Sequence, residues 1–356
     1  MGALGEEAPP KPDPLVERLQ ELALKPPFVT VVVTVYNYQR YLRPCLESIA
    51  TQTYPAFKCV VIDDCSSDGS AALVEQFIAE RPDDHRFTLI KHAQNLGQMA
   101  GFKTGLAHAD GEFLAYVDAD DVLLPGFLSK HLEHHLTGMP VAFTSSDQYQ
   151  INEHGEMIGG QHPDLLAQGK RRTVAPHHVF GNSWVWATTS SMMFRRAVLD
   201  LTLPDVIEPF RRCADNLVCH FSNLIGGSVL IPTVLGCYRR HGVNYFSQNR
   251  IVGGQHPTGD MRTHPAHPNV REVIVSHLLK NADRFIAVLG EWPYLRLLSR
   301  SMNFGEAIRF ARNPGTHAKL FSRRSTIAFL MTSFMQRLRW ALRDIWYAGP
   351  VITPVD

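Results

Sequence analysis

Residues 113–121 read Phe-Leu-Ala-Tyr-Val-Asp-Ala-Asp-Asp, a short apolar run that ends in three carboxylates. Such a run is typical of a strand that is buried on both faces of a sheet. In an extended chain residues i and i+2 point the same way, so Asp118 and Asp120 converge on one spot. Carboxylates at a strand end, together with phosphate oxygens, are typical of a Mg²⁺ or Mn²⁺ site. The alternative is an acidic turn that caps the helix beginning near Pro125.

The residues around this stretch alternate between two kinds of segment. Short apolar runs predict strands at 29–35, 59–62, 88–90 and 113–117, and helices are predicted between them at 42–50, 70–80 and 99–108. This alternation is typical of a doubly wound, mainly parallel sheet. Later in the chain we predict a strand at 141–143, a hairpin at 148–158 and helices at about 270–289, 293–312 and 325–347.

A second acidic cluster follows the strand at 59–62, where Asp63 and Asp64 are adjacent. Two neighbouring carboxylates repel each other unless they are solvated or receive donors, such as a nucleobase N–H or ribose hydroxyls. The strand at 29–35 leads into Thr34-Val35-Tyr36-Asn37, so three strands deliver polar groups to one edge of the sheet. These polar groups lie at the same edge as the predicted metal site.

The bulk composition excludes several classes of protein. With 35 Lys and Arg against 34 Asp and Glu, the net charge of +1 argues against a nucleic-acid binder. No apolar run reaches the roughly 18 residues of a spanning helix, and the acidic, proline-rich N-terminus is wrong for a signal peptide. Six scattered cysteines without a Cys-x-x-Cys pair predict reduced thiols in a cytoplasmic protein.

Five segments in order resemble the N-terminal half of family 2 glycosyltransferases of the GT-A fold, namely 29–37, 46–54, 61–70, 95–98 and 118–121. The resemblance implies an α/β GT-A domain, a doubly wound and mainly parallel sheet with a C-terminal helical extension. It also implies transfer of a sugar from a nucleotide-diphosphate donor, with a UDP-sugar favoured, to an acceptor hydroxyl with inversion. The product would belong to cell-surface polysaccharide or glycolipid synthesis.

Composition and periodicity, together with the resemblance over the catalytic domain, divide the chain into four parts. They are an N-terminal extension with a short helix (1–27), the GT-A catalytic domain (28–243), a mobile active-site loop (244–269) and a C-terminal helical region (270–356). Within the catalytic domain, 28–125 would be the nucleotide-binding half and 126–243 the acceptor-side half.

The resemblance also implies roles for single residues. Asp120 would hold Mn²⁺ or Mg²⁺ at the diphosphate, and Asp118 would contact the ribose or the donor sugar. The remaining donor-binding candidates are Thr34, Tyr36, Asn37, Asp63, Asp64, Asn95, Gly97, Lys103 and Ala119. For Lys103, which stands where the family commonly has a different residue, the alternative is a solvated helix face.

The second half of the chain resembles the family more loosely. Residues 190–196 resemble the acceptor-side strand, and Asp215 aligns with the catalytic base of the family's Glu-Asp pair, although Ala214 replaces the Glu. The alternative for Asp215 is a carboxylate in the first turn of a helix, where the helix dipole favours it. The segment 238–244 resembles Tyr-Arg-x-His-Gly-x-Asn, which makes His241 a ligand of the metal or of the diphosphate.

Two other functions compete with sugar transfer. A sugar nucleotidyltransferase would need a glycine-rich loop after the first strand, and none is present. A catalytically inactive nucleotide-sugar-binding or scaffold protein stays open because Ala214 replaces the expected Glu. Three histidines, at 131, 134 and 135, are interpreted as a solvent-facing side of a helix.

The last predicted helix is amphipathic and basic. Its apolar stripe comprises Ile327, Leu330, Met331, Phe334, Leu338, Ala341, Leu342 and Ile345, with five arginines and two tryptophans nearby. Such a helix is typical of peripheral contact with anionic lipid, here at the inner face of the cell membrane, where a lipid-linked acceptor would be found. The alternative is that the stripe packs against the catalytic domain or forms a homodimer.

Overall fold

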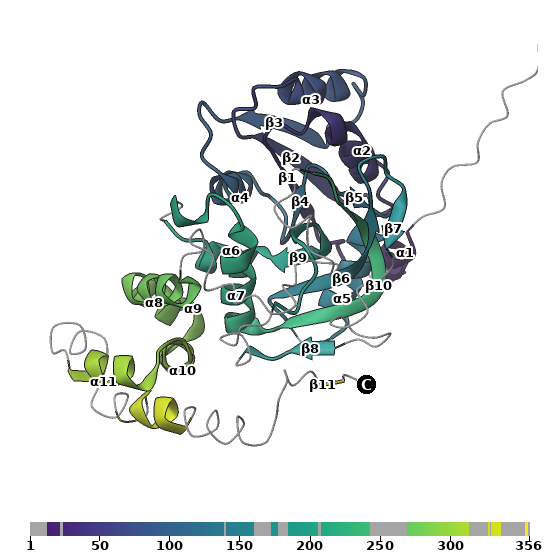
Figure 1. Ribbon diagram of the computed structural model, residues 1–356. Coiled ribbons are helices and arrows are strands. Elements are labelled where there is room, and N and C mark those ends of the chain that lie inside the picture. Colours follow the sequence, from purple (N-terminus) through teal and green to yellow (C-terminus); the bar gives the residue numbers. More distant parts are fainter. Residues whose placement is uncertain are drawn as a thin grey trace, which may run out of the picture.

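A computed structural model of the chain describes residues 13–21, 24–138, 140–159, 172–176, 184–205, 208–242, 269–312, 327, 329–335 and 353–354. Within these residues the strands form one mixed sheet in the order β11-β8-β10-β6-β9-β4-β1-β2-β3, with β5 paired to β10 and β7 paired to β6 (Figure 1). The strands are β1 (Val29–Val35), β2 (Phe57–Asp63), β3 (Phe87–Lys91), β4 (Phe113–Asp118), β5 (Val122–Leu123), β6 (Phe143–Ile151), β7 (Met157–Gly159), β8 (Arg172–Val174), β9 (Met192–Arg195), β10 (Ser228–Arg239) and β11 (Thr353–Pro354).

Helices cover both faces of this sheet. They are α1 (Pro14–Glu21), α2 (Gln39–Ala50), α3 (Ser70–Ala79), α4 (Gln98–Ala107), α5 (Phe127–Leu136), α6 (Arg196–Thr202), α7 (Ala214–Gly226), α8 (Val270–Lys280), α9 (Ala282–Leu289), α10 (Glu291–Ser301) and α11 (Phe304–Arg312). Alternate residues of β1 enter different cores: Val31 and Val33 pack with α2, α3 and α5, whereas Val32 packs with α4 and α7. The predicted doubly wound sheet is therefore confirmed, because its central strands are buried on both faces.

The parallel half of the sheet, β3-β2-β1-β4, carries the strand ends with the predicted site residues. The other half places a segment from late in the chain, residues 239–241, beside them. The strand β9 runs antiparallel to both β4 and β6, and β10 runs parallel to β6. The strand β5 pairs antiparallel with β10, with Cys237 opposite Val122. The chain that leaves β10 therefore runs beside the residues that precede β5, which places 239–241 next to Asp120 and Asp121.

The N-terminal and C-terminal helices extend this core. On α1 the side chains of Val16 and Leu19 are buried, and the Thr53 hydroxyl donates to Asp13 at 2.7 Å. The helices α8 to α10 pack beyond α7 and share its core through Phe221 and Phe285 (Figure 1). None of the described helices is long and apolar enough to cross a membrane.

The prediction for the histidines of α5 is wrong for two of the three. His131 and His135 are buried against β6, where their rings lie 2.6 and 3.2 Å from the Thr144 hydroxyl. Burial lowers the pKa of His135 to about 3 and lowers that of His131 as well, so both rings are neutral. Sequence spacing alone did not show which side of the helix faces the sheet.

Other predictions can be compared only in part. All six cysteines are free thiols. The turn of the predicted hairpin lies between β6 and β7, as expected. Nearly all of the predicted mobile loop, 244–269, lies outside the described residues, as does the part of the last predicted helix after residue 335.

Candidate active site

The carboxyl ends of β1, β2 and β4 meet at one edge of the sheet. Thr34 lies opposite Asp118, and Val35 lies opposite Asp63. The Asp63 carboxylate is buried; its Oδ2 accepts the N–H of Ser66 at 3.1 Å, whereas its Oδ1 accepts no hydrogen bond from any described residue. A buried acceptor without a donor is uncommon in native proteins, so this oxygen is a candidate for a ligand's N–H.

The neighbouring Asp64 serves the protein itself. Its Oδ1 accepts the N–H of Leu96 at 2.9 Å and contacts the His92 ring at 2.7 Å, and its Oδ2 accepts the N–H of Gly97 at 2.7 Å. Both oxygens thus hold the loop that contains Asn95 and Gly97. The structure gives Asp64 this positioning contact, which the sequence did not predict.

The predicted residues at the end of β1 have different surroundings. Asn37, at φ 60°, accepts the N–H of Ser67 on its Oδ1 at 2.8 Å and so orders the loop after β2. The Tyr36 side chain is exposed, and Thr34 is half-buried under Gly101 of α4. Tyr36 and Asn37 are both exposed, but the Asn37 side chain is already bound by Ser67, so Tyr36 is the better candidate for ligand contact.

Four carboxylates gather where β4 ends and α7 begins. Thr189, on the short 3₁₀ helix Thr189–Ser191, hydrogen-bonds with both Asp118 and Asp215, which are far apart in the sequence. Burial, followed by the charges of Asp120 and Asp215, raises the pKa of Asp118 to about 7. Burial raises the pKa of Asp215 to about 6, and burial with the charges of Asp120 and Asp118 raises the pKa of Asp121 well above its usual value. Such a cluster favours protons or a bound cation.

Gln98 joins the two carboxylate-bearing segments. Its Nε2 donates to Asp118 Oδ1 at 3.1 Å, and its Oε1 accepts the N–H of Ala214, the first residue of α7, at 2.9 Å. The Arg211 guanidinium donates to the side chain and carbonyl of Asn95 at 2.6 and 2.7 Å. The loop 95–98 is thereby fastened to the start of the helix that carries Asp215.

Asp120 lies against His241, with Oδ2 2.9 Å from Nε2, and both side chains are buried. The His241 ring stacks on Tyr41 with ring centroids 4.6 Å apart. Arg239 fixes the carboxylate strand from the other side, since its N–H donates to Asp121 Oδ1 and its Nε to the Asp120 carbonyl, at 2.9 and 2.8 Å. Neighbouring Ala119 is buried within the core beneath the site.

The donor set at Asp120 and His241 fits a divalent cation. An octahedral ion with ligands at about 2.1 Å places neighbouring ligand atoms about 3.0 Å apart, which matches the Oδ2 to Nε2 separation. Oxygen and imidazole ligands suit Mn²⁺. Among the described residues no group of three or more His, Cys, Asp or Glu forms a complete metal site, so phosphate oxygens and water would have to fill the remaining positions.

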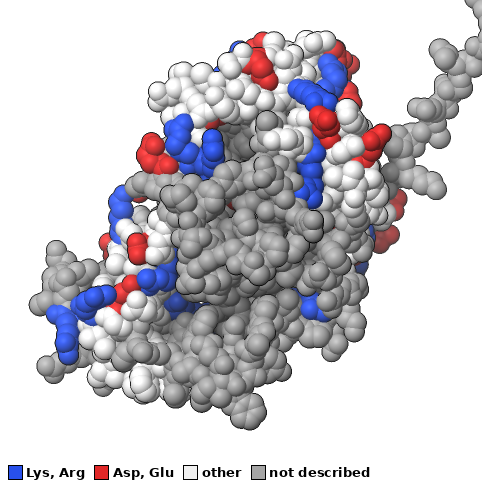
Figure 2. All heavy atoms as spheres, in the orientation of Figure 1, with Lys and Arg blue, Asp and Glu red and all other residues white. Residues whose placement is uncertain are grey.

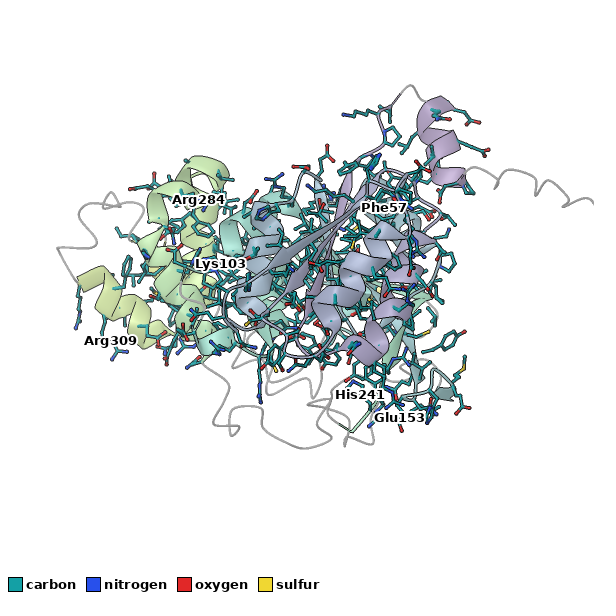
Figure 3. All side chains as sticks on the ribbon, turned by 90° about the horizontal axis from the view of Figure 1, so that it is seen from above. Phe57, Lys103, Glu153, His241, Arg284 and Arg309 are labelled. Atoms are coloured by element: carbon teal, nitrogen blue, oxygen red, sulfur yellow. The ribbon has the colours of Figure 1, made fainter. Side chains whose placement is uncertain are left out.

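The structure does not bring Lys103 to this site. Its Nζ donates to the carbonyls of Pro204 and Asp205, at 2.8 and 3.4 Å. In Figure 3 the side chain lies toward the C-terminal helices, away from His241. These contacts do not support a phosphate-binding role for Lys103 and favour a place on the side of the helix away from the site.

Comparison with known proteins finds a family of similar sequence. Residues 30–202 match the model described as Glycosyl transferase family 2. This part of the chain, just under half of its length, is similar to that family. The matched range includes the strand ends of β1, β2 and β4 and stops before Asp215 and His241.

Individual proteins are similar to this chain over segments of different length. The chain is 25% identical over 325 residues to an uncharacterized glycosyltransferase of Nostoc sp., covering 89% of this chain and 86% of that protein. It is 29% identical over 107 residues to a Bacillus subtilis glycosyltransferase named for teichuronic acid biosynthesis, covering 30% of this chain and 41% of the relative. S. aureus TarS 1–349 in complex with UDP superposes with a TM-score of 0.48 at 14% identity, covering 92% and 96% of the two chains.

Four residues of the site were missed by sequence reasoning. Gln98 and Arg239 lie inside quoted motifs but were given no role, whereas Thr189 and Arg211 lie outside the quoted motifs. Each acts through a partner about 70 to 120 residues away, which the order of residues alone does not reveal.

Proposed function

We propose that this chain is a family 2 glycosyltransferase that moves a sugar from a nucleotide-diphosphate donor to an acceptor hydroxyl with inversion, with the help of a divalent metal. One observation carries the proposal. Asp118 and Asp215 flank Thr189 beside the Asp120–His241 pair, at the edge where parallel α/β sheets bind their ligands. A base candidate and a metal-ligand candidate thus face one site.

The donor nucleotide is proposed to bind at the ends of β1 and β2. The buried Asp63 Oδ1 lacks a donor, and a uracil N3–H would supply one, which favours a UDP-sugar. The exposed Tyr36 side chain offers an aromatic surface at the same edge. Asp64 and Asn37 would act indirectly, by holding the loops at 95–98 and 66–68 in place.

Asp120 and His241 are proposed to hold Mn²⁺ or Mg²⁺ at the diphosphate. When bound there, the ion supplies Lewis-acid stabilisation of the charge on the leaving nucleotide. Arg239 keeps the Asp120 backbone in place, and Asp118 faces the donor sugar or ribose. The close approach of Asp118, Asp120 and Asp215 is unfavourable without a cation, which supports a metal at this position.

Asp215 is proposed as the general base. With its pKa raised to about 6 by burial, it is ionised at neutral pH yet basic enough to take the acceptor hydroxyl's proton. A single base that faces a single leaving group is consistent with one displacement and inversion at the anomeric carbon. The position of Asp215 in the first turn of α7 also favours its ionised form through the helix dipole.

The acceptor is proposed to be a carbohydrate or lipid-linked saccharide in cell-surface polysaccharide or glycolipid synthesis, on the cytoplasmic side of the membrane. The relative named for teichuronic acid biosynthesis supports this class of product. A lipid-linked acceptor would require the protein to work at a membrane surface.

Calorimetric titration with UDP and a panel of nucleotide sugars, with and without Mn²⁺, tests the proposal. We expect Mn²⁺-dependent binding that Asp120→Asn removes and Asp83→Asn, an exposed carboxylate on the surface, retains. Release of UDP with product formation then separates a transferase from an inactive binding protein. Metal-independent binding, or full activity of Asp120→Asn, would contradict the assignment.

A further inference from the structure

The charge of the chain is divided between its two parts. Residues 270–356 contain 13 Lys and Arg against 6 Asp and Glu, a net charge of +7, whereas residues 1–269 contain 22 against 28, a net charge of −6. The net charge of the whole chain is near zero because a basic C-terminal region and an acidic remainder offset each other. Figure 2 shows part of this basic region as Lys and Arg side chains at the lower left, over the C-terminal helices.

The helical segment 327–335 is apolar on two opposite sides. Phe329 and Ser333 are buried against the other C-terminal helices. The opposite side carries exposed apolar side chains at helical spacing, which are Ile327, Met331, Phe334 and Met335, between 43% and 64% exposed. The outer side of a helix in a globular domain normally carries polar residues. An exposed apolar side therefore indicates a site of interaction with a partner.

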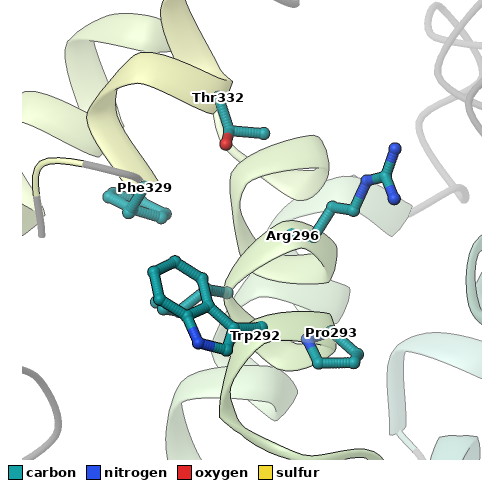
Figure 4. A pocket seen from close by; sticks show the side chains of 6 residues that line it. Trp292, Pro293, Arg296, Phe329 and Thr332 are labelled. Atoms are coloured by element: carbon teal, nitrogen blue, oxygen red, sulfur yellow. The ribbon is translucent and has the colours of Figure 1, made fainter. Parts of the chain in front are cut away.

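Neighbouring helices carry further exposed apolar side chains. Val288, near the end of α9, and Trp292, at the start of α10, are both exposed. Trp292 lines a pocket of about 300 Å³ together with Phe329 and Thr332 of the helical segment, so the two elements adjoin (Figure 4). We call this set of exposed side chains, Val288, Trp292, Ile327, Met331, Phe334 and Met335, the Trp292 surface.

Cations lie at the edge of the Trp292 surface. Arg296 lines the pocket and is exposed, and Arg300 follows one helical turn later on α10. No described acidic side chain pairs with either guanidinium within salt-bridge distance. Burial is the main cause that lowers the pKa of Arg300, and the nearby charge of Arg296 lowers it further. An anion between them would relieve this repulsion.

We propose that the Trp292 surface docks on an anionic lipid bilayer, with its apolar side chains among the acyl chains and Arg296 at the phosphate headgroups. An exposed tryptophan beside apolar side chains and arginines is the pattern of an interfacial membrane contact. The acidic catalytic domain would be repelled by the same bilayer, so the charge division orients the protein with its helical region toward the lipid.

A second copy of the chain fits this surface less well. In a two-fold dimer the same patch meets itself, so Arg296 and Arg300 of one copy would approach those of the other without a compensating acid. The docking inference is independent of the chemistry of transfer. It complements the proposed lipid-linked acceptor, which such a surface would reach.

Vesicle flotation of the full chain tests the inference. The vesicles contain phosphatidylcholine alone or phosphatidylcholine with a fraction of phosphatidylglycerol. We expect binding to the anionic vesicles only, weakened by salt, and a loss of partition of at least about tenfold in Trp292→Glu, Met331→Glu and Arg296→Glu. Matched controls on α5, Leu136→Glu and Lys130→Glu, change an exposed apolar and an exposed basic residue and should bind as the parent does.

Each outcome supports or overturns the proposal. Absence of flotation with anionic vesicles, or equal losses in the control variants, overturns it. A dimer in solution that Met331→Glu dissociates, without vesicle binding by the parent, assigns the surface to a second copy instead. Nucleotide binding measured on the same variants in solution reports on the fold and on the proposed transferase site, so the failure of one proposal is distinguishable from the failure of the other.

Discussion

Replacement of Gln98 by Leu removes two hydrogen bonds that connect Asp118, on the proposed donor side, to the helix that carries the proposed base Asp215. The side chain donates to Asp118 and accepts the N–H of Ala214, a residue that is fully buried at the start of α7. A hydrogen bond to a charged group contributes about 1.5–3 kcal/mol, and a buried N–H without an acceptor costs about 1–3 kcal/mol. We expect the free energy of unfolding to fall by about 2–4 kcal/mol, since the two effects overlap.

The activity should change in a way that lost stability alone would not produce. Because the hydrogen bond from Gln98 holds the pKa of Asp118 down, its loss should raise that pKa above its value of about 7. A larger fraction of Asp118 is then protonated at neutral pH. We expect kcat to fall about 10- to 100-fold and the acidic limb of the pH–rate profile to move to higher pH.

Steady-state kinetics over a range of pH, at a temperature where both proteins are folded, measure this effect. Gln76→Leu on α3 is the matched control, since it removes an exposed hydrogen bond to Glu80 and should leave kcat unchanged. The positioning role of Gln98 is refuted if Gln98→Leu changes only the melting temperature, with kcat within about twofold and an unshifted pH profile.

Three further substitutions and one titration test other parts of the site. Asp215→Asn should lower kcat by about 10²–10⁴-fold with donor binding retained, and equal losses in donor affinity would place the base elsewhere. In the parent, kcat/KM should decline below pH about 6, because Asp215 then takes up a proton. The raised pKa values of Asp118 and Asp215 also affect the stability of the metal-free protein. Its free energy of unfolding should fall as the pH rises from about 4 to 7, which thermal unfolding measures. Asp63→Asn should weaken UDP binding about 10- to 100-fold in calorimetry, and unchanged affinity would move the nucleobase away from Asp63. Gly97→Ala should destabilise by more than about 1 kcal/mol in chemical denaturation, because its φ is +87° and the added Cβ would lie 2.5 Å from the Arg211 Cα.

The local sequence was sufficient to predict the sheet and the edge at which its strand-end carboxylates gather. Alternating apolar strands and amphipathic helices dictate a doubly wound sheet, because strands buried on both faces need helices on both sides. In parallel strands the carboxyl ends share one edge, so Asp63 and Asp118 could be placed together before any contact was known. The bounds of β1, Val29–Val35, agree with the prediction, because the apolar run that predicts the strand is buried in the sheet along its length.

Only the tertiary structure decided how the polar groups are used. The carboxylates of Asp63 and Asp64 look alike in sequence, but the returning loop at 95–98 satisfies Asp64 and leaves one oxygen of Asp63 without a donor. Gln98 and Ala214 are 116 residues apart, and a contact over that distance leaves no periodic signal in either segment. Likewise His131 is buried rather than solvated, because the orientation of α5 is set by the sheet it packs on and not by the spacing of its own residues. Periodicity reports which residues share a face, whereas the partner of that face is fixed by the long-range packing of the whole domain.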